Sequence, residues 1–463
     1  MTGVADPPRT ASDDAACRVN LGPGSLIFFH IIYVFVCCVS LVATAQFYAP
    51  LLRIVPTDQY HLALAATHVA PFALLSILFV VCRFSFGYAL SFYFYTVILG
   101  YLWLTGFSQF KYDHALAYAS AIASGLALFL PALFIASPVK QRFVMSRDAF
   151  DRLLFFILIL ASVVLAIGAS FNVRLVGISD VADVRNRLAF PVWLQYAMDA
   201  TSTVLLPFAF ACFAMLGKPW RAGLSLLLLL LFYPVTLSKS TLLAPAWLPL
   251  LALASRYFST RATTILSLLV PILLGVFLKG LFDAGVLSYA KFMTYFGLVN
   301  FRMVALASGA IDVYNDFFAS HQLTHFCQIT FMKWFIDCPY PQSLALTLQN
   351  YGLGNINASL LATEGIASVG PMLAPLSVSA CGLVIALGNR LSSGLPPRVI
   401  LISSGVLVQA FINVPFTITM VTFGGAILFL LWYVTPRDVF ESPAETAGAE
   451  TKHLTLPPES VRK

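Results

Sequence analysis

The stretch Ser25-Leu-Ile-Phe-Phe-His-Ile-Ile-Tyr-Val-Phe-Val-Cys-Cys-Val-Ser-Leu-Val-Ala-Thr-Ala-Gln-Phe47 determines the class of fold. It contains no charged side chain. As a helix rising about 1.5 Å per residue, it is long enough to cross a hydrocarbon core about 30 Å thick. The rest of the 463-residue chain is similar, with 59% hydrophobic and only 10% charged residues, whereas soluble domains carry roughly 25% charged residues. We therefore predict an integral membrane protein.

The predicted fold class is all-α. No stretch alternates apolar and polar residues as the strands of an outer-membrane barrel do, so the membrane-spanning segments are helices. We expect a polytopic membrane domain over residues 25–434, between a disordered polar arm (1–24) and a disordered polar tail (435–463). About twelve transmembrane helices are expected, at residues 25–47, 62–81, 86–104, 115–136, 152–171, 196–216, 224–237, 242–253, 263–282, 371–387, 399–414 and 417–434.

The distribution of lysine and arginine predicts the orientation of the chain. If the N-terminus is cytoplasmic and the spans alternate, the short links on the cytoplasmic side are basic, as the positive-inside rule requires. The basic residues of these links are Arg83, Lys140, Arg142, Arg147, Arg152, Lys218, Arg221, Arg256, Arg261, Arg390 and Arg398. Both termini are then cytoplasmic, and the two substantial loops, 172–195 and 283–370, share the outer face.

A second stretch, Asn350-Tyr-Gly-Leu-Gly-Asn-Ile-Asn-Ala-Ser-Leu-Leu-Ala-Thr-Glu-Gly-Ile-Ala-Ser-Val-Gly370, holds the candidate catalytic residue Glu364. The other four glutamates all lie in the C-terminal tail. An acidic group at a membrane boundary is costly to desolvate, which makes it a functional candidate. The alternative is a solvated glutamate that begins a helix and is stabilised by the helix dipole.

Positive charge on the expected outer face runs against the usual bias, so it needs a reason. The candidate ligand-binding residues among these outer cations are Arg174, Arg185, Arg187, Lys239 and Arg302. An anionic ligand such as a diphosphate headgroup is one reason, because a planar guanidinium pairs two oxygens at once. The alternative is structural, since Asp180 and Asp183 can neutralise the neighbouring arginines and Lys239 can extend toward the headgroups.

The longer outer loop mixes aromatic and polar side chains, a composition typical of helices that lie in the membrane interface. His321 and His325 are four residues apart, which would place them on one helical face. No third ligand has a suitable spacing, so no metal is expected. Cys327 and Cys338 face an oxidising compartment in this orientation, and the sequence leaves open whether they form a disulfide or are buried separately in lipid.

Several stretches resemble the bacterial oligosaccharide repeat-unit polymerases of the O-antigen and exopolysaccharide polymerase type. They are Leu237-Ser-Lys-Ser-Thr-Leu-Leu-Ala-Pro245, Tyr295-Phe-Gly-Leu-Val-Asn-Phe-Arg302, Tyr314-Asn-Asp-Phe-Phe318 and Gly354-Asn-Ile-Asn-Ala-Ser-Leu-Leu-Ala-Thr-Glu-Gly-Ile-Ala-Ser-Val-Gly370. The order of about twelve spans is also similar and covers most of the chain. The chain departs from the family in lacking clean Arg…Gly loop repeats.

The resemblance implies glycosyl transfer between two polyprenyl-diphosphate-linked oligosaccharides at the periplasmic face of the bacterial inner membrane. Glu364 would then be the general base, and the outer cations would bind the diphosphate. The further substrate-binding candidates are Tyr314, His321, His325 and Asn357. No cofactor or metal is implied.

The expected partners are lipid-linked oligosaccharides, membrane lipid, and flippase and chain-length regulator proteins. The net charge of +7 is scattered without a basic block, so no nucleic-acid partner is expected. Two other functions stay open. One is another polyprenyl-phosphate-sugar transferase, although the first outer loop has only Asp58 where such enzymes usually show paired acids. The other is a lipid-linked glycan flippase or transporter, which predicts a polar cavity midway across the membrane and internal repeats.

Overall fold

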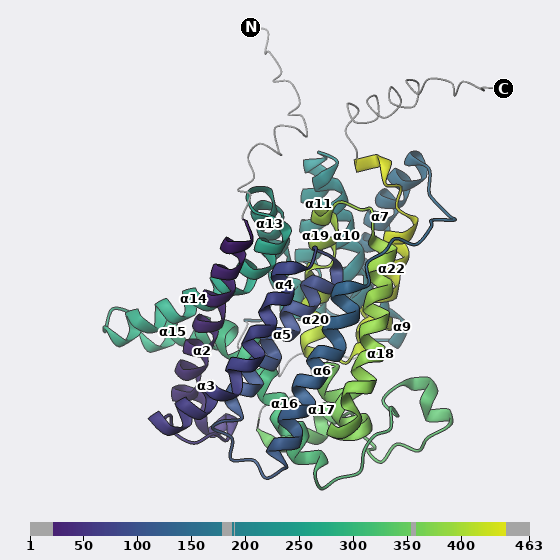
Figure 1. Cartoon of the computed structure of the whole chain (residues 1–463). Helices are drawn as coiled ribbons and strands as arrows, with labels where there is room; N and C mark the ends of the chain where they lie inside the picture. The colour runs from purple at the N-terminus through teal and green to yellow at the C-terminus, as the bar shows by residue number, and fades with distance from the viewer. Residues whose placement is uncertain (1–21, 178–187, 189, 353–357, 441–463) are drawn as a thin grey trace, which may run out of the picture.

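The computed structural model describes residues 22–177, 188, 190–352 and 358–440, and the regular secondary structure of this part of the chain is helical (Figure 1). The helices up to the middle of the chain are α2 (Pro23–Leu52), α3 (Gln59–Ala73), η1 (Leu74–Ser76), α4 (Ile77–Val81), α5 (Phe86–Leu104), α6 (His114–Phe134), α7 (Arg147–Phe171), α9 (Val192–Ala200), η2 (Thr201–Leu205), α10 (Leu206–Met215), α11 (Pro219–Leu231), α12 (Tyr233–Thr236) and α13 (Lys239–Tyr257). Those that follow are α14 (Thr260–Asp283), α15 (Tyr289–Phe296), η3 (Gly297–Ala305), α16 (Leu306–Phe318), η4 (Thr330–Trp334), α17 (Leu344–Thr347), η5 (Leu348–Tyr351), η6 (Leu361–Ala367), α18 (Ser368–Ser392), α19 (Pro397–Ser403), α20 (Gly405–Asn413), α21 (Phe416–Val421), α22 (Gly425–Val434) and η7 (Asp438–Phe440).

Ten helices in the described residues are long and apolar enough to cross a membrane. Their outward faces carry large exposed apolar side chains, such as Phe28, Ile31 and Phe35 on α2. Apolar surface of this extent is unstable in water and stable against lipid chains. The prediction of an all-helical, polytopic membrane protein is therefore confirmed.

The positions of the spans differ in part from the sequence expectation. Three of the twelve expected spans are shorter, less apolar or interrupted helices here: α13, the pair α19 and α20, and the pair α21 and α22. Conversely, Tyr289–Phe318 forms a helical segment long and apolar enough to cross, although residues 283–370 were expected to be an outer loop with interfacial helices. Within that range, the described residues after Phe318 that lie outside long helices are 319–352 and 358–360.

The core of the protein surrounds α5, which lies at the centre of the bundle (Figure 1). Every residue of α5 is buried, and α2, α3, α6, α16, α18 and α20 pack against it. Two of its polar side chains bond to neighbouring helices: Thr96 bonds the Tyr33 hydroxyl, and the Tyr93 hydroxyl lies 3.0 Å from Ser267 Oγ. A helix apolar on all sides is stable only when neighbours cover every face, which explains why this segment is central.

The short basic links meet at one end of the bundle, which we call the basic end. There, Arg261 donates to Val80 O, Lys218 Nζ lies 2.6 Å from Asp151 Oδ1, and Arg437 donates to Leu391 O. In Figure 1 this is the upper end, where α2 begins and α22 ends. The opposite end, with the links 53–58 and 105–113 and the segment 319–352, is called the loop end below.

Three helices are joined at a polar contact near the basic end. Gly87 N of α5 donates to Asn389 Oδ1 of α18 (2.6 Å), and Asn389 Nδ2 donates to Ala132 O of α6 (2.7 Å). These groups are buried and cannot bond to water, so each internal hydrogen bond compensates for a bond to water that folding removes. The contact fixes the height of α18, the helix that follows the candidate site, relative to α5 and α6.

We expect the Gly87→Ala substitution to destabilise the protein by about 1–3 kcal/mol, the usual cost of overpacking a core. An added Cβ would collide with Ala132 O and would lie 2.9 Å from Asn389 Nδ2. Thermal unfolding in detergent measures this cost. Gly223→Ala in α11 is the matched control, because nothing lies within 4 Å of its added Cβ. Equal melting temperatures for the two variants would contradict the packing argument.

The chain reverses direction at Gly370, within the segment Leu361–Ser392. Gly370 has φ 77° and ψ 164°, a conformation open essentially only to glycine. The helix before it folds back along α18, so that Ser377 Oγ donates to Glu364 O across the hairpin (2.7 Å). The preceding arm, η6, is a π-helix, as are η2 and η3. Such wide helical turns occur frequently at functional sites.

Candidate functional site

Glu364 lies inside the hairpin and is only 2% exposed. Its Oε1 accepts two hydrogen bonds from Thr417 at the start of α21, one from the backbone N–H and one from the hydroxyl, both 3.2 Å long. Its Oε2 is buried and has no hydrogen-bond partner in the structure. The alternative that Glu364 is a solvated residue at a helix start is therefore wrong.

The surroundings of Glu364 are mostly apolar, with a few hydroxyl and thiol groups. Tyr314 of α16 is buried, and its hydroxyl lies near the Thr363 side chain and the Glu364 carboxyl. Cys381 of α18 is also close to the carboxyl group. On the other side of η6, Gly365 allows the close approach of Ala374 and Val378. The neighbouring side chains named here carry no charge, so Glu364 has no counter-ion among them.

The arrangement gives the two carboxyl oxygens different roles. Oε1 is oriented by two donors from one residue, whereas Oε2 has its lone pairs free. A buried acid without a full set of partners costs several kcal/mol, so its presence calls for a physical explanation. A carboxyl group with one oxygen fixed and the other free is suited to accept a proton from a bound hydroxyl.

The predicted cations lie on different elements. Arg302 is exposed on η3, Arg174 is exposed in the segment after α7, and Lys239 is half-buried at the first turn of α13. The segment after α7 is attached to the turn before α13, since Arg174 N donates to Pro234 O. No salt bridge between described residues involves Glu364. Arg185, Arg187 and Asn357 lie outside the described residues.

The two histidines do not share a helical face, so this prediction is wrong. The helix α16 ends at Phe318, and both residues follow in irregular structure. The His321 ring stacks on Phe317 at 3.9 Å, and its Nδ1 lies 2.8 Å from Phe317 O. His325 is exposed and has a positive φ of 46°. The expectation used only the spacing of four residues, which places two side chains on one face only where a helix continues through both, and α16 stops before either histidine.

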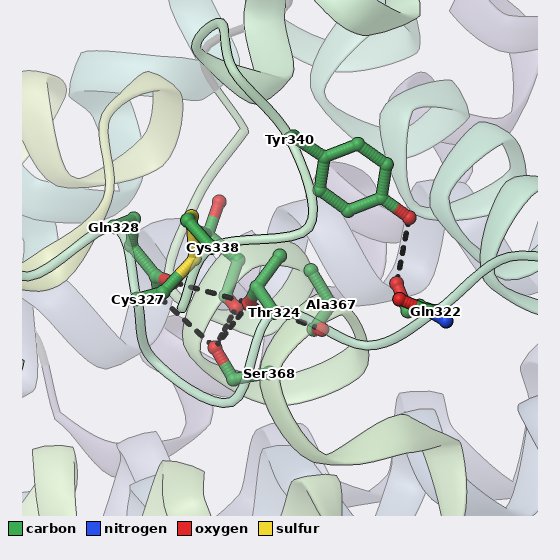
Figure 2. The surroundings of a disulfide bond; sticks show 9 residues. Gln322, Thr324, Cys327, Gln328, Cys338, Tyr340, Ala367 and Ser368 are labelled. Carbon is green, nitrogen blue, oxygen red and sulfur yellow. Dashed lines mark hydrogen bonds between the residues drawn. A yellow bond between two sulfur atoms is a disulfide. The ribbon is translucent and has the colours of Figure 1, made fainter. Parts of the chain in front are cut away.

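Cys327 and Cys338 form a disulfide, which decides the question that the sequence left open. Their Cα atoms are 5.3 Å apart, and the bond closes a loop that carries Phe331, Trp334 and Phe335, all exposed. Figure 2 shows this bond beside Thr324, Gln328 and Ser368. The loop therefore packs directly against the end of the helix that carries Glu364.

A second buried acid, Asp312 of α16, was missed in the sequence. It is 2% exposed and accepts a hydrogen bond from the Tyr112 hydroxyl. The same hydroxyl lies 3.3 Å from Tyr101 and 3.4 Å from Thr105. Burial, with the nearby Asp312 charge, raises the pKa of Tyr112 well above its usual range, so the phenol keeps its proton and remains a donor. The signal was an aspartate within the apolar run 304–313.

Asp316, one turn after Asp312, connects the segments of the loop end. It accepts hydrogen bonds from Lys111 N and from the Tyr351 hydroxyl, each 2.9 Å long. The Arg53 guanidinium lies 5.1 Å from the Tyr351 ring centre, a cation–π distance. Burial and the bond to Asp316 raise the pKa of Tyr351 to about 12. These contacts fix η5 against the link between α5 and α6.

No protein-family model, curated protein or solved structure matches this chain. The resemblance to oligosaccharide polymerases rests on the quoted motifs alone. The geometry around Glu364 is the structural observation that bears on function.

Proposed function

We propose that this chain polymerises lipid-linked oligosaccharide repeat units, with Glu364 as the general base. The single observation that carries the proposal is the asymmetry of its carboxyl group: Oε1 is fixed by Thr417, and Oε2 is buried without a partner. The motif resemblance supplies the reaction class. The proposed location is the bacterial inner membrane, with both termini cytoplasmic and the loop end facing the periplasm.

The proposed reaction moves a growing glycan from polyprenyl diphosphate to the terminal sugar of another lipid-linked unit. The acceptor hydroxyl oxygen attacks the anomeric carbon and forms the new glycosidic bond. The bond between that carbon and the diphosphate oxygen breaks, and its electron pair leaves with the lipid diphosphate. The hydroxyl proton passes to ionised Glu364, whose free Oε2 is the accepting atom. Neither a cofactor nor a metal takes part in this scheme.

The leaving diphosphate needs positive charge where its negative charge accumulates. The helices α7 and α13 each have one terminus at the basic end, as the partners of Asp151 and the Arg398–Ser255 contact indicate. Arg174 and Lys239, at the other termini, therefore lie toward the loop end. We assign diphosphate binding to these cations together with Arg302, which is exposed on η3.

Reconstitution in liposomes tests the proposal. The purified protein is supplied with synthetic polyprenyl-diphosphate-linked repeat units, and the products are sized after mild acid release from the lipid. Glycans of two and more units, with one free polyprenyl diphosphate for each bond formed, are expected. Recovery of single units alone, from a protein that has inserted and folded, would reject the polymerase function.

We expect Thr417→Val to lower kcat by about 10- to 100-fold. The substitution removes the hydroxyl donor to Glu364 Oε1 and keeps the side-chain shape. A hydrogen bond to a charged group contributes about 1.5–3 kcal/mol, and about 1.4 kcal/mol corresponds to a tenfold change in rate. Initial rates of glycan dimer formation give the measurement. Thr417→Ser, which retains the hydroxyl, should recover most of the rate.

Thr419→Val is the matched control for this substitution. Thr419 lies two residues further along α21, and its hydroxyl bonds only Pro415 O within the same helix. Its removal should change the rate by less than about threefold. A similar loss in both variants would show that hydroxyl removal weakens α21 in general, and that orientation of Glu364 has no special part.

A second function, transport of a lipid-linked glycan, is favoured by the interrupted helices. The segment after α19 breaks before α20, before α21 and again at Gly424, which has φ 83°. Broken helices around a buried acid are typical of transporters. The liposome assay separates the functions, because a transporter moves labelled lipid-linked units between leaflets without releasing polyprenyl diphosphate.

A further inference from the structure

One turn of the loop end, residues 324–328, is hydrogen-bonded to the end of η6, the helix that carries Glu364. Thr324 N donates to Ala367 O (2.8 Å) and His325 N donates to Ser368 O (3.2 Å). These are carbonyls at the end of the first hairpin arm, which lack partners where the helix stops. The turn therefore replaces the missing helical bonds and fixes the place where η6 passes into α18.

Side chains of the same turn reach further toward Glu364. Gln328 Nε2 donates to Ser368 Oγ (2.9 Å), and Ser368 Oγ donates to Thr363 O (2.7 Å), the residue next to Glu364. The Thr324 hydroxyl lies 3.3 Å from the same Ser368 oxygen. Thr324 and Ser368 are both buried. A continuous chain of hydrogen bonds thus joins the turn to the residue before the acid (Figure 2).

The turn itself has an unfavourable backbone. His325 and Phe326 are consecutive non-glycine residues with positive φ values of 46° and 65°. Each such residue costs on the order of 1–3 kcal/mol and persists only where its surroundings fix it. The next residue is Cys327, buried and bonded to Cys338. The disulfide is the covalent constraint nearest to the strained pair.

We infer that the Cys327–Cys338 disulfide is a positioning device for Glu364. The disulfide constrains the strained turn, and the turn is hydrogen-bonded to Ala367 and Ser368. These bonds fix the position of η6, in which Glu364 contacts Thr417. Thr324, Gln328 and Ser368 are positioning residues and touch no substrate in this scheme. Reduction by a dithiol, which converts the disulfide to two thiols, releases the turn and lets the arm move. The catalytic consequence rests on the proposed function, whereas the structural coupling does not.

Hydrogen–deuterium exchange on the full-length protein in lipid nanodiscs tests the coupling without any activity. Exchange of the amides of residues 358–369 is measured in the oxidised protein, after reduction with dithiothreitol, and after reoxidation. Reduction should accelerate this exchange at least tenfold, and reoxidation should reverse the change. Thiol titration confirms that two new thiols form. Unchanged exchange in the reduced protein would overturn the inference.

Variants distinguish the positioning effect of the disulfide from a general loss of folding. The double variant Cys327→Ser with Cys338→Ser should exchange like the reduced protein, whereas Cys82→Ser, a free cysteine near the basic end, should exchange like the wild type. Thr324→Val should raise exchange at residues 358–369, and Thr324→Ser should not. Identical exchange in these last two variants would remove the hydroxyl from the proposed hydrogen-bond chain.

The liposome assay tests the effect of reduction on catalysis. Reduction should lower kcat for glycan dimer formation by at least tenfold and leave KM for the lipid-linked unit within about twofold, because Glu364 moves while the binding surfaces remain. A rise in KM at constant kcat would contradict the positioning role. If the oxidised wild type forms no glycan bond, the proposed function is wrong. The exchange experiment still decides whether the disulfide controls the mobility of residues 358–369.

Discussion

Replacement of Glu364 by glutamine should abolish glycan polymer while leaving the protein folded in the membrane. Glutamine has the same shape and an amide oxygen that can still accept the two bonds from Thr417. It cannot accept a proton at the free position. General bases contribute about 10²- to 10⁴-fold to reaction rates, so chain extension should fall below detection within one generation of cells.

The measurement is the size distribution of surface glycan in a deletion strain that carries each variant on a plasmid. Single repeat units are expected with Glu364→Gln, and long chains with the wild type. Asp148→Asn is the matched control, because Asp148 is an exposed acid at the start of α7 near the basic end. Wild-type chain lengths from Glu364→Gln would remove Glu364 from the mechanism.

Gly370→Ala should inactivate the protein through the backbone. The added methyl group would contact only Leu323, at 3.6 Å, which is an ordinary van der Waals distance. The conformation itself, φ 77° and ψ 164°, costs a residue with a side chain on the order of 1–3 kcal/mol. The hairpin would relieve this cost by opening, which withdraws Glu364 from Thr417. A displacement of about 1 Å can reduce a rate about 100-fold.

Two measurements on Gly370→Ala distinguish opening of the hairpin from global unfolding. Exchange at residues 358–369 should rise, while exchange in α5 and α6 stays at the wild-type level. The rate of glycan dimer formation should fall at least 100-fold. Gly223→Ala again serves as the control, and it should be neutral or slightly stabilising, since alanine favours helix by about 1 kcal/mol over glycine. Full activity in Gly370→Ala would show that the reversal does not position Glu364.

Hydropathy predicted the class of fold and most spans, and it failed where polar groups are paired inside the bundle. Tyr289–Phe318 contains Asn300, Asp312 and Asn315, all buried, which lowered its apparent apolarity. Asn300 Nδ2 donates to Ser40 Oγ and to Ile272 O, partners that are distant in sequence, whereas its Oδ1 is buried without a hydrogen-bond partner. These polar residues interrupt the apolar run, which is why the prediction omitted a segment that is long and apolar enough to cross a membrane.

The sequence indicated Glu364, but it did not indicate Thr417, and the chain reversal at Gly370 was not predicted. Glu364 stood out because it is the one glutamate outside the tail, and its burial agrees with a special role. Thr417 did not stand out, because nothing local marks a threonine at a helix break as the partner of an acid 53 residues away. The Gly370-Pro371 pair was a readable signal of a chain reversal, but the span was expected to start only after it.

The three π-helical segments, η2, η3 and η6, have a consequence for comparing this chain with relatives. A π-helical turn takes up more residues than an α-helical one, and each residue of an α-helix turns the chain by about 100°. Relatives with regular α-helices at these places should therefore align with gaps of one residue there. An engineered one-residue deletion in Thr201–Leu205 should rotate α9 by about a quarter-turn relative to α10 and so move part of its buried surface outward.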